Sequence, residues 1–168
     1  MDNLPKEILQ ELLSAESKGA QRKPAAAQPQ AADHWASAVL LERAAYLSKL
    51  AKNGNGSAGE TLREYAGHCA MLSFRSRDGE AEVHESFADV FFILEGRATL
   101  VTGGTVSGAA SIGPGEIRGR SLVGGRRQEL RAGDVAHVPA GLPHQMLVAG
   151  ETTVTSLVMK IEEAERPR

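Results

Sequence analysis

From about residue 61 to residue 161, short apolar runs with a period near two alternate with turns that contain glycine. A period of two is the pattern of a β-strand with one buried face. The runs are not separated by helical stretches, and 18 glycines with only 4% aromatic residues favour many tight turns. The sequence therefore predicts an antiparallel sandwich or barrel. The expected strands are residues 68–75, 81–86, 90–94, 98–102, 127–131, 135–139, 145–148 and 152–161.

A helical extension is expected before this region. Residues 1–17 predict an N-terminal amphipathic helix, because apolar residues recur at helical spacing from Leu4 to Leu13. Residues 18–32 contain Gly19, Pro24 and Pro29 and have no apolar periodicity, which predicts a flexible linker. The first helix has two interpretations: it packs on the outside of the barrel, or it docks on another subunit.

Residues 33–60 predict a second helix and a loop that pack on the barrel, which itself spans residues 61–163. Asp33 is the expected cap, and Asn53-Gly54 is expected to end the helix near Lys52. We expect a polar loop over residues 53–59. The expected apolar side of this helix consists of Val39, Leu40, Ala44, Leu47 and Leu50.

One connection inside the barrel is unusually long. It runs from Gly103 to Gly125 and contains Glu116, Arg118 and Arg120. A connection of this length is either functional or a flexible decoration. The arginines would reach an anionic substrate only if the segment folds over the mouth of the barrel.

Charge and composition exclude several classes of protein. The formal net charge is -2, so the chain has no general attraction for a phosphate backbone, and we expect no nucleic-acid partner. No apolar stretch is long enough for a membrane helix, and charged residues near the start argue against a signal peptide. Cys69 is the only cysteine, which excludes a disulfide within the chain and a thiolate zinc cluster. We therefore expect a cytoplasmic protein in which any metal is bound by His, Asp and Glu.

Two segments carry residues with metal-binding chemistry, residues 82–96 and residues 133–144. In a strand, Glu82 and His84 share one face, whereas Asp89 has the opposite parity. A turn or bulge near residues 87–88 is needed to bring Asp89 to the same side. His144 follows a turn at residues 139–141 and a proline, Pro143, that restricts the backbone. A histidine held in this way is a rigid ligand.

The two segments resemble the motifs of the cupin superfamily. Gly133, Pro139, Gly141 and His144 match the second motif without a gap, and only its final Asn is missing, at Val148. In the first motif, Glu82 stands at the first His position, His84 at the second His, Asp89 at the Glu and Gly96 at the Gly. The resemblance covers residues 65–161 and departs from the pattern at Glu82 and Asp89, both of which still carry metal-binding groups.

The resemblance implies an all-β fold, a double-stranded β-helix (jelly-roll) cupin barrel with an N-terminal α-helical extension. It also implies a divalent metal ion bound by Glu82, His84, Asp89 and His144. Imidazoles and carboxylates without sulfur suit Fe, Mn, Zn or Ni, and the second carboxylate favours the harder ions. Such an ion polarises a carbonyl group or lowers the pKa of a bound water to about 7.

Two residues have more than one interpretation. Glu82 is a ligand, a partner that orients His84, or a general base beside the metal. His137 either lines the cavity as a proton shuttle or faces away from it. We therefore include Glu82 and His137 as candidate catalytic residues.

The leading hypothesis is a metal-binding cupin that acts on a small organic molecule by dioxygenase, isomerase or lyase chemistry. The alternative is a non-catalytic cupin module that binds a small ligand such as a sugar or an amino acid, because the first motif is degraded. A purely structural barrel is disfavoured, since Glu82 and His84 would be costly in a dry core. Similar small cupins are often dimers, so we expect a homodimer.

Overall fold

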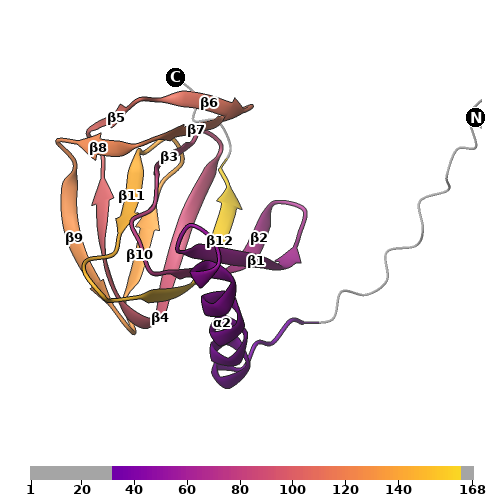
Figure 1. Cartoon of the computed structure of the whole chain (residues 1–168). Helices are drawn as coiled ribbons and strands as arrows, with labels where there is room; N and C mark the ends of the chain where they lie inside the picture. Colours follow the sequence, from indigo (N-terminus) through magenta and orange to yellow (C-terminus); the bar gives the residue numbers. More distant parts are fainter. Residues whose placement is uncertain (1–31, 164–168) are drawn as a thin grey trace, which may run out of the picture. The chain divides into compact units, whose positions relative to one another are not determined.

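The structure is a computed structural model that describes residues 32–163 (Figure 1). The predicted helix of residues 1–17 and almost all of the predicted linker of residues 18–32 lie outside the described residues. The fold described below is that of the unit that begins at Trp35. None of the helices among residues 32–163 has the length and hydrophobicity needed to span a membrane.

One helix, α2 (Ser37–Lys52), precedes an almost entirely β structure. The prediction of short antiparallel strands separated by glycine turns is confirmed. The strands are β1 (Ser57–Glu64), β2 (His68–Arg75), β3 (Ala81–His84), β4 (Phe87–Thr102), β5 (Thr105–Ser107), β6 (Ala110–Gly113), β7 (Glu116–Gly119), β8 (Ser121–Val123), β9 (Arg126–Arg131), β10 (Val135–Val138), β11 (His144–Leu147) and β12 (Val154–Glu162).

The long strand β4 connects the two halves of the jelly roll. The main sheet has the order β1-β2-β12-β4-β11-β3-β7-β6. The first half of β4 pairs with β12 and β10, and its second half pairs with β9 and β11. The strand changes direction at Gly96, which has a φ of 80°. Because all of these pairings are antiparallel and wrap around one interior, the chain forms a jelly roll in the form of a half-barrel.

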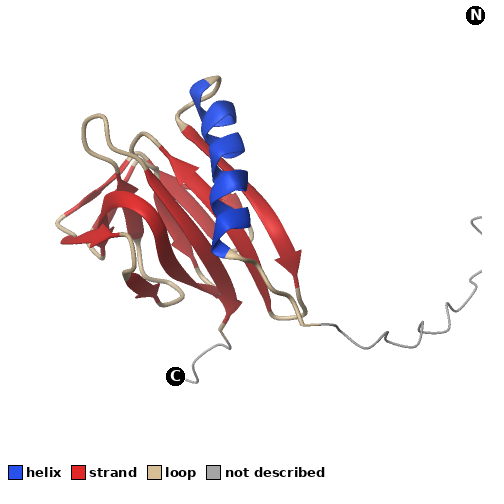
Figure 2. Ribbon diagram, turned by 90° about the horizontal axis from the view of Figure 1, so that it is seen from below, coloured by secondary structure: helices blue, strands red, loops and turns tan. Residues whose placement is uncertain are grey.

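Strand β2 separates the interior of the barrel from the helix. Its side chains alternate, so that Leu72 and Phe74 face α2 while Met71, Ser73 and Arg75 face the interior. Figure 2 shows α2 lying across the outer face of this sheet. The helix buries one stripe at helical spacing against Leu72 and Phe74. That stripe consists of Leu40, Ala44, Leu47 and Ala51.

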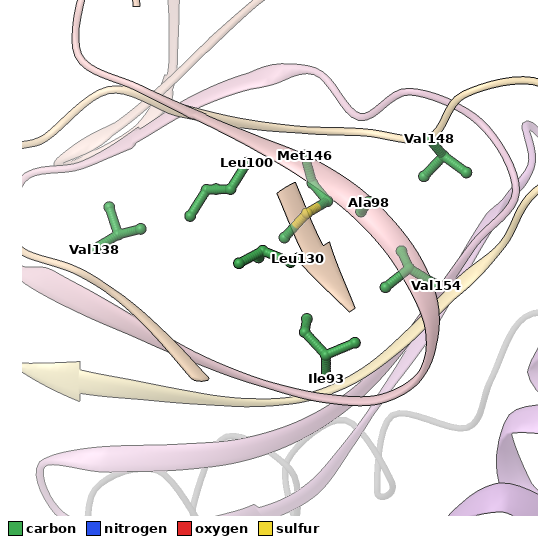
Figure 3. Packing of buried hydrophobic residues seen from close by; sticks show 8 residues of the cluster. All are labelled: Ile93, Ala98, Leu100, Leu130, Val138, Met146, Val148 and Val154. Carbon is green, nitrogen blue, oxygen red and sulfur yellow. The ribbon is translucent and has the colours of Figure 1, made fainter. Parts of the chain in front are cut away.

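A second apolar cluster fills part of the interior. It draws side chains from both halves of β4 and from the strands around it, as Figure 3 shows. Burial of each Val or Leu of this kind contributes about 1.5–3 kcal/mol relative to exposure. Its members are Ile93, Ala98, Leu100, Leu130, Val138, Met146, Val148 and Val154. Met146 and Val154 also line the cavity described below, so this cluster forms the floor of that cavity.

The structure corrects several local predictions in the strands. Residues 57–59, expected in the polar loop, begin β1, a strand that the sequence did not predict; β1 carries few apolar residues and lies at the edge of the sheet. Residues 90–94 and 98–102 belong to one continuous strand, because Gly96 bends β4 without ending it. The connection of residues 103–125 contains β5, β6, β7 and β8, so it is neither a long loop nor a structureless decoration.

The start of α2 also differs from the prediction. The helix begins at Ser37, and Ala36 precedes it without a side-chain capping bond, so Asp33 is not the cap. Val39 and Leu50, expected on the apolar side, are 48% and 45% exposed. The buried face of the helix includes Ala51 in place of these two residues. The predicted end is confirmed, because Asn53 follows the last helical residue.

Gly96→Ala should destabilise the protein much more than Gly124→Ala. Both glycines have a positive φ, but a Cβ at Gly96 would collide with the carbonyl oxygen of Thr153, whereas a Cβ at Gly124 meets open space. We expect a loss of about 1 kcal/mol for Gly124→Ala from the backbone conformation. For Gly96→Ala we expect more than about 3 kcal/mol. Denaturant unfolding of both variants measures this difference, and equal losses would contradict the role given to β4.

Candidate metal centre

Three strands bring Glu82, His84, Asp89 and His144 together in the interior of the barrel. Glu82 and His84 lie on the same face of β3, as their spacing predicts. The chain then turns at residues 85–86, and β4 begins at Phe87, so that Asp89 also faces the interior. His144 is the first residue of β11 and stands opposite Glu82 in the β11–β3 pair.

The four side chains are close enough to share one ion. The Nε2 atom of His84 lies 3.3 Å from Glu82 Oε2 and 3.4 Å from Asp89 Oδ2. The Nε2 atom of His144 lies 3.2 Å from Asp89 Oδ2 and 3.9 Å from Glu82 Oε2. Ligand atoms about 2.1 Å from one metal ion lie about 3.0–3.4 Å apart when they are neighbours. One potential ligand atom from each residue falls within 4.8 Å of all the others, which fits a single coordination sphere.

The protonation of the two imidazoles supports this fit. The Nδ1 atom of His84 lies 2.9 Å and 2.7 Å from the carboxylate oxygens of Glu116, and His144 Nδ1 lies 3.2 Å from the carbonyl oxygen of Leu142. Both partners accept hydrogen bonds, so Nδ1 carries a proton in each ring, and Nε2 is the atom that would present its lone pair to a metal ion between the carboxylates. Both Nε2 atoms are buried and make no well-formed hydrogen bond with the described residues. Positive charge is therefore favoured between these Nε2 atoms and the carboxylates, and a metal ion would supply it.

Neighbouring charges hold the carboxylates in place. Arg118 Nη1 lies 2.6 Å from Glu82 Oε2, and Lys160 Nζ donates a hydrogen bond of 2.9 Å to Asp89 Oδ1. Strand pairing explains both contacts, because Arg118 stands opposite Glu82 in the β3–β7 pair and Lys160 stands opposite Asp89 in the β4–β12 pair. Asp89 meets Lys160 with Oδ1 and the imidazoles with Oδ2, whereas Oε2 of Glu82 contacts both Arg118 and the imidazoles.

These surroundings shift the pKa values of the cluster. Burial alone would lower the pKa of His84, but the adjoining carboxylates of Asp89 and Glu82 raise it from 6.5 to about 9. Burial would raise the pKa of Glu82, yet His84 and Arg118 lower it from 4.5 to about 2. The pKa of Asp89 is also lowered, because His144, His84 and Lys160 outweigh its burial. Both acids are thus ionised at neutral pH, which is the form that binds a metal.

The cluster lies in the wall of a cavity of about 410 Å³. This volume is in the range of pockets for small molecules. One part of the wall is polar and carries the four clustered residues together with Arg75, Glu116, Arg118 and Lys160. Another part is apolar and includes Met71, Phe91, Met146 and Val158. An organic molecule in this cavity would therefore touch both the candidate metal centre and an apolar surface.

The structure does not bring His137 to this site. The side chain of His137 is 54% exposed, and its Nε2 atom lies 3.9 Å from Glu163 Oε1. Because it points away from the cavity, it is in no position to act as the proton shuttle considered from the sequence. The role of orienting His84, one alternative for Glu82, belongs to Glu116, which contacts Nδ1 on the side of the ring opposite the cluster.

The sequence motifs did not identify Glu116 and Arg118 as part of the site. Both come from β7, inside the connection that was expected to be either functional or decorative. Their spacing of two residues was the available signal, since it matches the spacing of Glu82 and His84. The pairing of β7 with β3, however, depends on a register that the sequence alone did not reveal.

Comparisons with known proteins show the fold. No protein-family model and no curated protein matches the chain. The structure of TT1209 from Thermus thermophilus has 19% sequence identity and a TM-score of 0.52, and the match covers 74% of this chain and 95% of that one. The chain has a cupin-type double-stranded β-helix fold with a buried His, Glu and Asp cluster that resembles a metal site.

Two further solved structures are similar at lower scores. A protein with a double-stranded β-helix domain from Klebsiella pneumoniae has 16% identity and a TM-score of 0.49, with 65% of this chain and 75% of that chain covered. An oxalate oxidase has 16% identity and a TM-score of 0.46, with 64% of this chain covered. The chain spans about half the length of that oxidase, 52%.

Glu116→Gln should weaken metal binding by about 10–100-fold, because it removes the charge that orients His84. The measurement is a competition titration with Zn²⁺ or Mn²⁺ and a chromophoric chelator. Glu95→Gln is the matched control, since Glu95 is an exposed acid on the same sheet and lines no part of the cavity. An affinity that falls equally in both variants, or in neither, would contradict the role of Glu116.

The metal-free protein should lose stability as the pH rises from about 6.5 to about 9. The pKa of His84 is raised to about 9 in the folded protein, so the fold binds this proton more tightly than the unfolded chain does. This contribution is complete below pH 6.5 and disappears as the pH passes the folded pKa. Thermal unfolding with a chelator present checks it. The decline should be absent from His84→Ala, and an equal decline in this variant would exclude His84 as its source.

Proposed function

We propose that this protein is a small metal-dependent enzyme of the cupin fold that acts on a small organic molecule. The proposed metal ligands are His84, His144, Asp89 and Glu82. The observation that carries the proposal is that two buried imidazole lone pairs and two ionised carboxylates converge at 3.2–3.9 Å. A dry core that lacked an ion would not favour such an arrangement. Fe, Mn, Zn and Ni all suit this set of oxygen and nitrogen ligands.

The side chains around the cluster have distinct roles in this proposal. A bound ion would supply Lewis acidity toward a substrate oxygen or toward a water molecule. Arg118 and Lys160 hold the carboxylates of Glu82 and Asp89, and Glu116 keeps His84 in one tautomer. Phe91 and Met146 place apolar surface beside the cluster, which excludes water and strengthens the local electrostatic interactions.

Glu82 is the best candidate for proton transfer. It is the most accessible of the four clustered residues, with 20% of its side chain exposed, and it faces the cavity. Its lowered pKa makes it a weak base until Arg118 moves from its carboxylate. Dioxygenase, isomerase and lyase reactions all remain compatible with one open coordination position beside such a group.

A non-catalytic binding module is the second candidate function. The observation that favours it is charge balance, because each carboxylate already has a cationic or protonated neighbour. Glu82 lies beside Arg118, Asp89 beside Lys160, and Glu116 beside His84. In this alternative the cavity binds a small ligand through the same polar wall, and metal analysis separates the two candidates.

The double variant His84→Ala, His144→Ala should lose its bound metal. Wild-type protein purified without chelators is expected to contain close to one divalent ion per chain by elemental analysis, and the variant close to none. His137→Ala is the matched control, because His137 is an exposed histidine on a neighbouring strand and should leave the metal content unchanged. Near-zero metal in both wild type and double variant, after incubation with Fe(II), Mn(II), Zn(II) and Ni(II), would reject the proposal and favour the binding module.

A further inference from the structure

A bound metal ion would leave the cavity wall with an excess of positive charge. Three cationic side chains line the cavity, Arg75, Arg118 and Lys160. Three acidic side chains line it as well, Glu82, Asp89 and Glu116. Imidazoles that bind a metal are neutral, so the three cations and three acids then cancel and a divalent ion leaves an excess of two positive charges in a partly enclosed space. Such an excess is compensated most directly by an anionic ligand.

Arg75 is the cation that is least engaged by the acids. Its Nη2 atom lies 3.5 Å from Glu82 Oε1, whereas Arg118 approaches the same carboxylate to 2.6 Å and Lys160 approaches Asp89 to 2.9 Å. A guanidinium group forms two parallel hydrogen bonds with a carboxylate when the fork is accessible. Arg75 therefore has capacity to bind an anion without releasing a metal ligand.

The guanidinium group of Arg75 packs against Gly79. A Cβ at Gly79 would lie 2.9 Å from Arg75 Nη1, so the missing side chain leaves the room that this group occupies. Gly79 is itself fixed to β11, because its N–H donates to the carbonyl oxygen of Met146 and its carbonyl accepts from Gln145 Nε2. The same turn thus positions Arg75 and braces the strand that carries His144.

The wall next to Arg75 changes from polar to apolar along β2 and β12. On the face of β2 that lines the cavity, the side chains nearest to Arg75 are Ser73 and then Met71, in the direction of the start of the strand. Ser73 stands opposite Ser156 on β12, and Met71 stands opposite Val158. Val158 in turn stands opposite Phe91 on β4. A ligand whose charged group meets Arg75 would therefore lay its hydrocarbon part on Met71, Val158 and Phe91.

We infer that the cavity takes a small organic carboxylate with an apolar portion, and that Arg75 binds its carboxylate group. This inference rests on the proposed function, because the excess of two positive charges exists only when a divalent ion is bound. It names the class of substrate for that site and assigns a specificity role to a residue outside the metal ligands.

The test compares phenylacetate with phenylacetamide, which have nearly the same shape but differ in charge. Binding to Zn²⁺-loaded protein is measured by ligand-observed NMR titration, and the zinc content of each sample is measured separately. We expect phenylacetate to bind at least about tenfold more tightly than the amide. Acetate should bind more weakly than phenylacetate, because it leaves the apolar wall uncovered.

Variants of Arg75 then locate the source of this preference. Arg75→Gln should reduce the preference for the carboxylate to about twofold or less, and Arg75→Lys should give an intermediate value because the charge remains but the fork is lost. Arg127→Gln is the matched control, since Arg127 is an exposed arginine on β9 that does not line the cavity. Thermal unfolding checks that each variant is folded. If Arg75→Gln does not fold, the reduced preference of Arg75→Lys tests the role of Arg75.

Two results would overturn the inference while the proposed function stands. One is equal binding of carboxylate and amide by protein that contains zinc. The other is a preference that survives in both Arg75 variants, which would mean that the metal alone holds the carboxylate. A wild type that contains no zinc, and no Fe, Mn or Ni after incubation with these ions, gives a different result, because it rejects the proposed function and with it the inference.

Discussion

The register of the short strand β3 with β7 and β11 is the constraint on which the site depends. β3 has only four residues, yet it pairs with β7 on one side and β11 on the other. These pairs place Arg118 beside Glu82, Glu116 beside His84, and His144 beside Glu82. A slip of one residue in either pair would turn the inward side chains to the opposite face. The register therefore decides whether the cluster exists at all.

Electrostatic interactions at this site are organised as alternating layers of charge. The imidazoles face the acids of the cluster, and the acids are held from behind by Arg118 and Lys160. On the side of His84 that faces away from the cluster, the acid Glu116 holds the imidazole, as the two cations hold the acids. Each of these seven ionisable side chains is buried or partly buried beside a partner that lowers the cost of its charge, which explains how they share one interior. Beside them, the apolar floor supplies the burial that stabilises the barrel.

Local features of the sequence predicted much of this structure. The alternation of Glu82 and His84 and the proline-rich turn before His144 depend on neighbouring residues, so they could be recognised without coordinates. Contacts that depend on distant pairing could not. Glu116 and Arg118 reach the site only through the β3–β7 register, and β1 has no apolar alternation because it is an edge strand. Gly96 was interpreted as a strand end, although its backbone only bends β4.

Strand β7 lies next to β6, the last strand of the main sheet, whereas the candidate metal ligands come from strands nearer its centre. Two groups that hold the ligands, Glu116 and Arg118, thus come from a peripheral β-hairpin, whereas Lys160 and the ligands come from inner strands. Changes in this hairpin that keep the β3–β7 register would act on the centre through Glu116 and Arg118 and leave both apolar clusters intact.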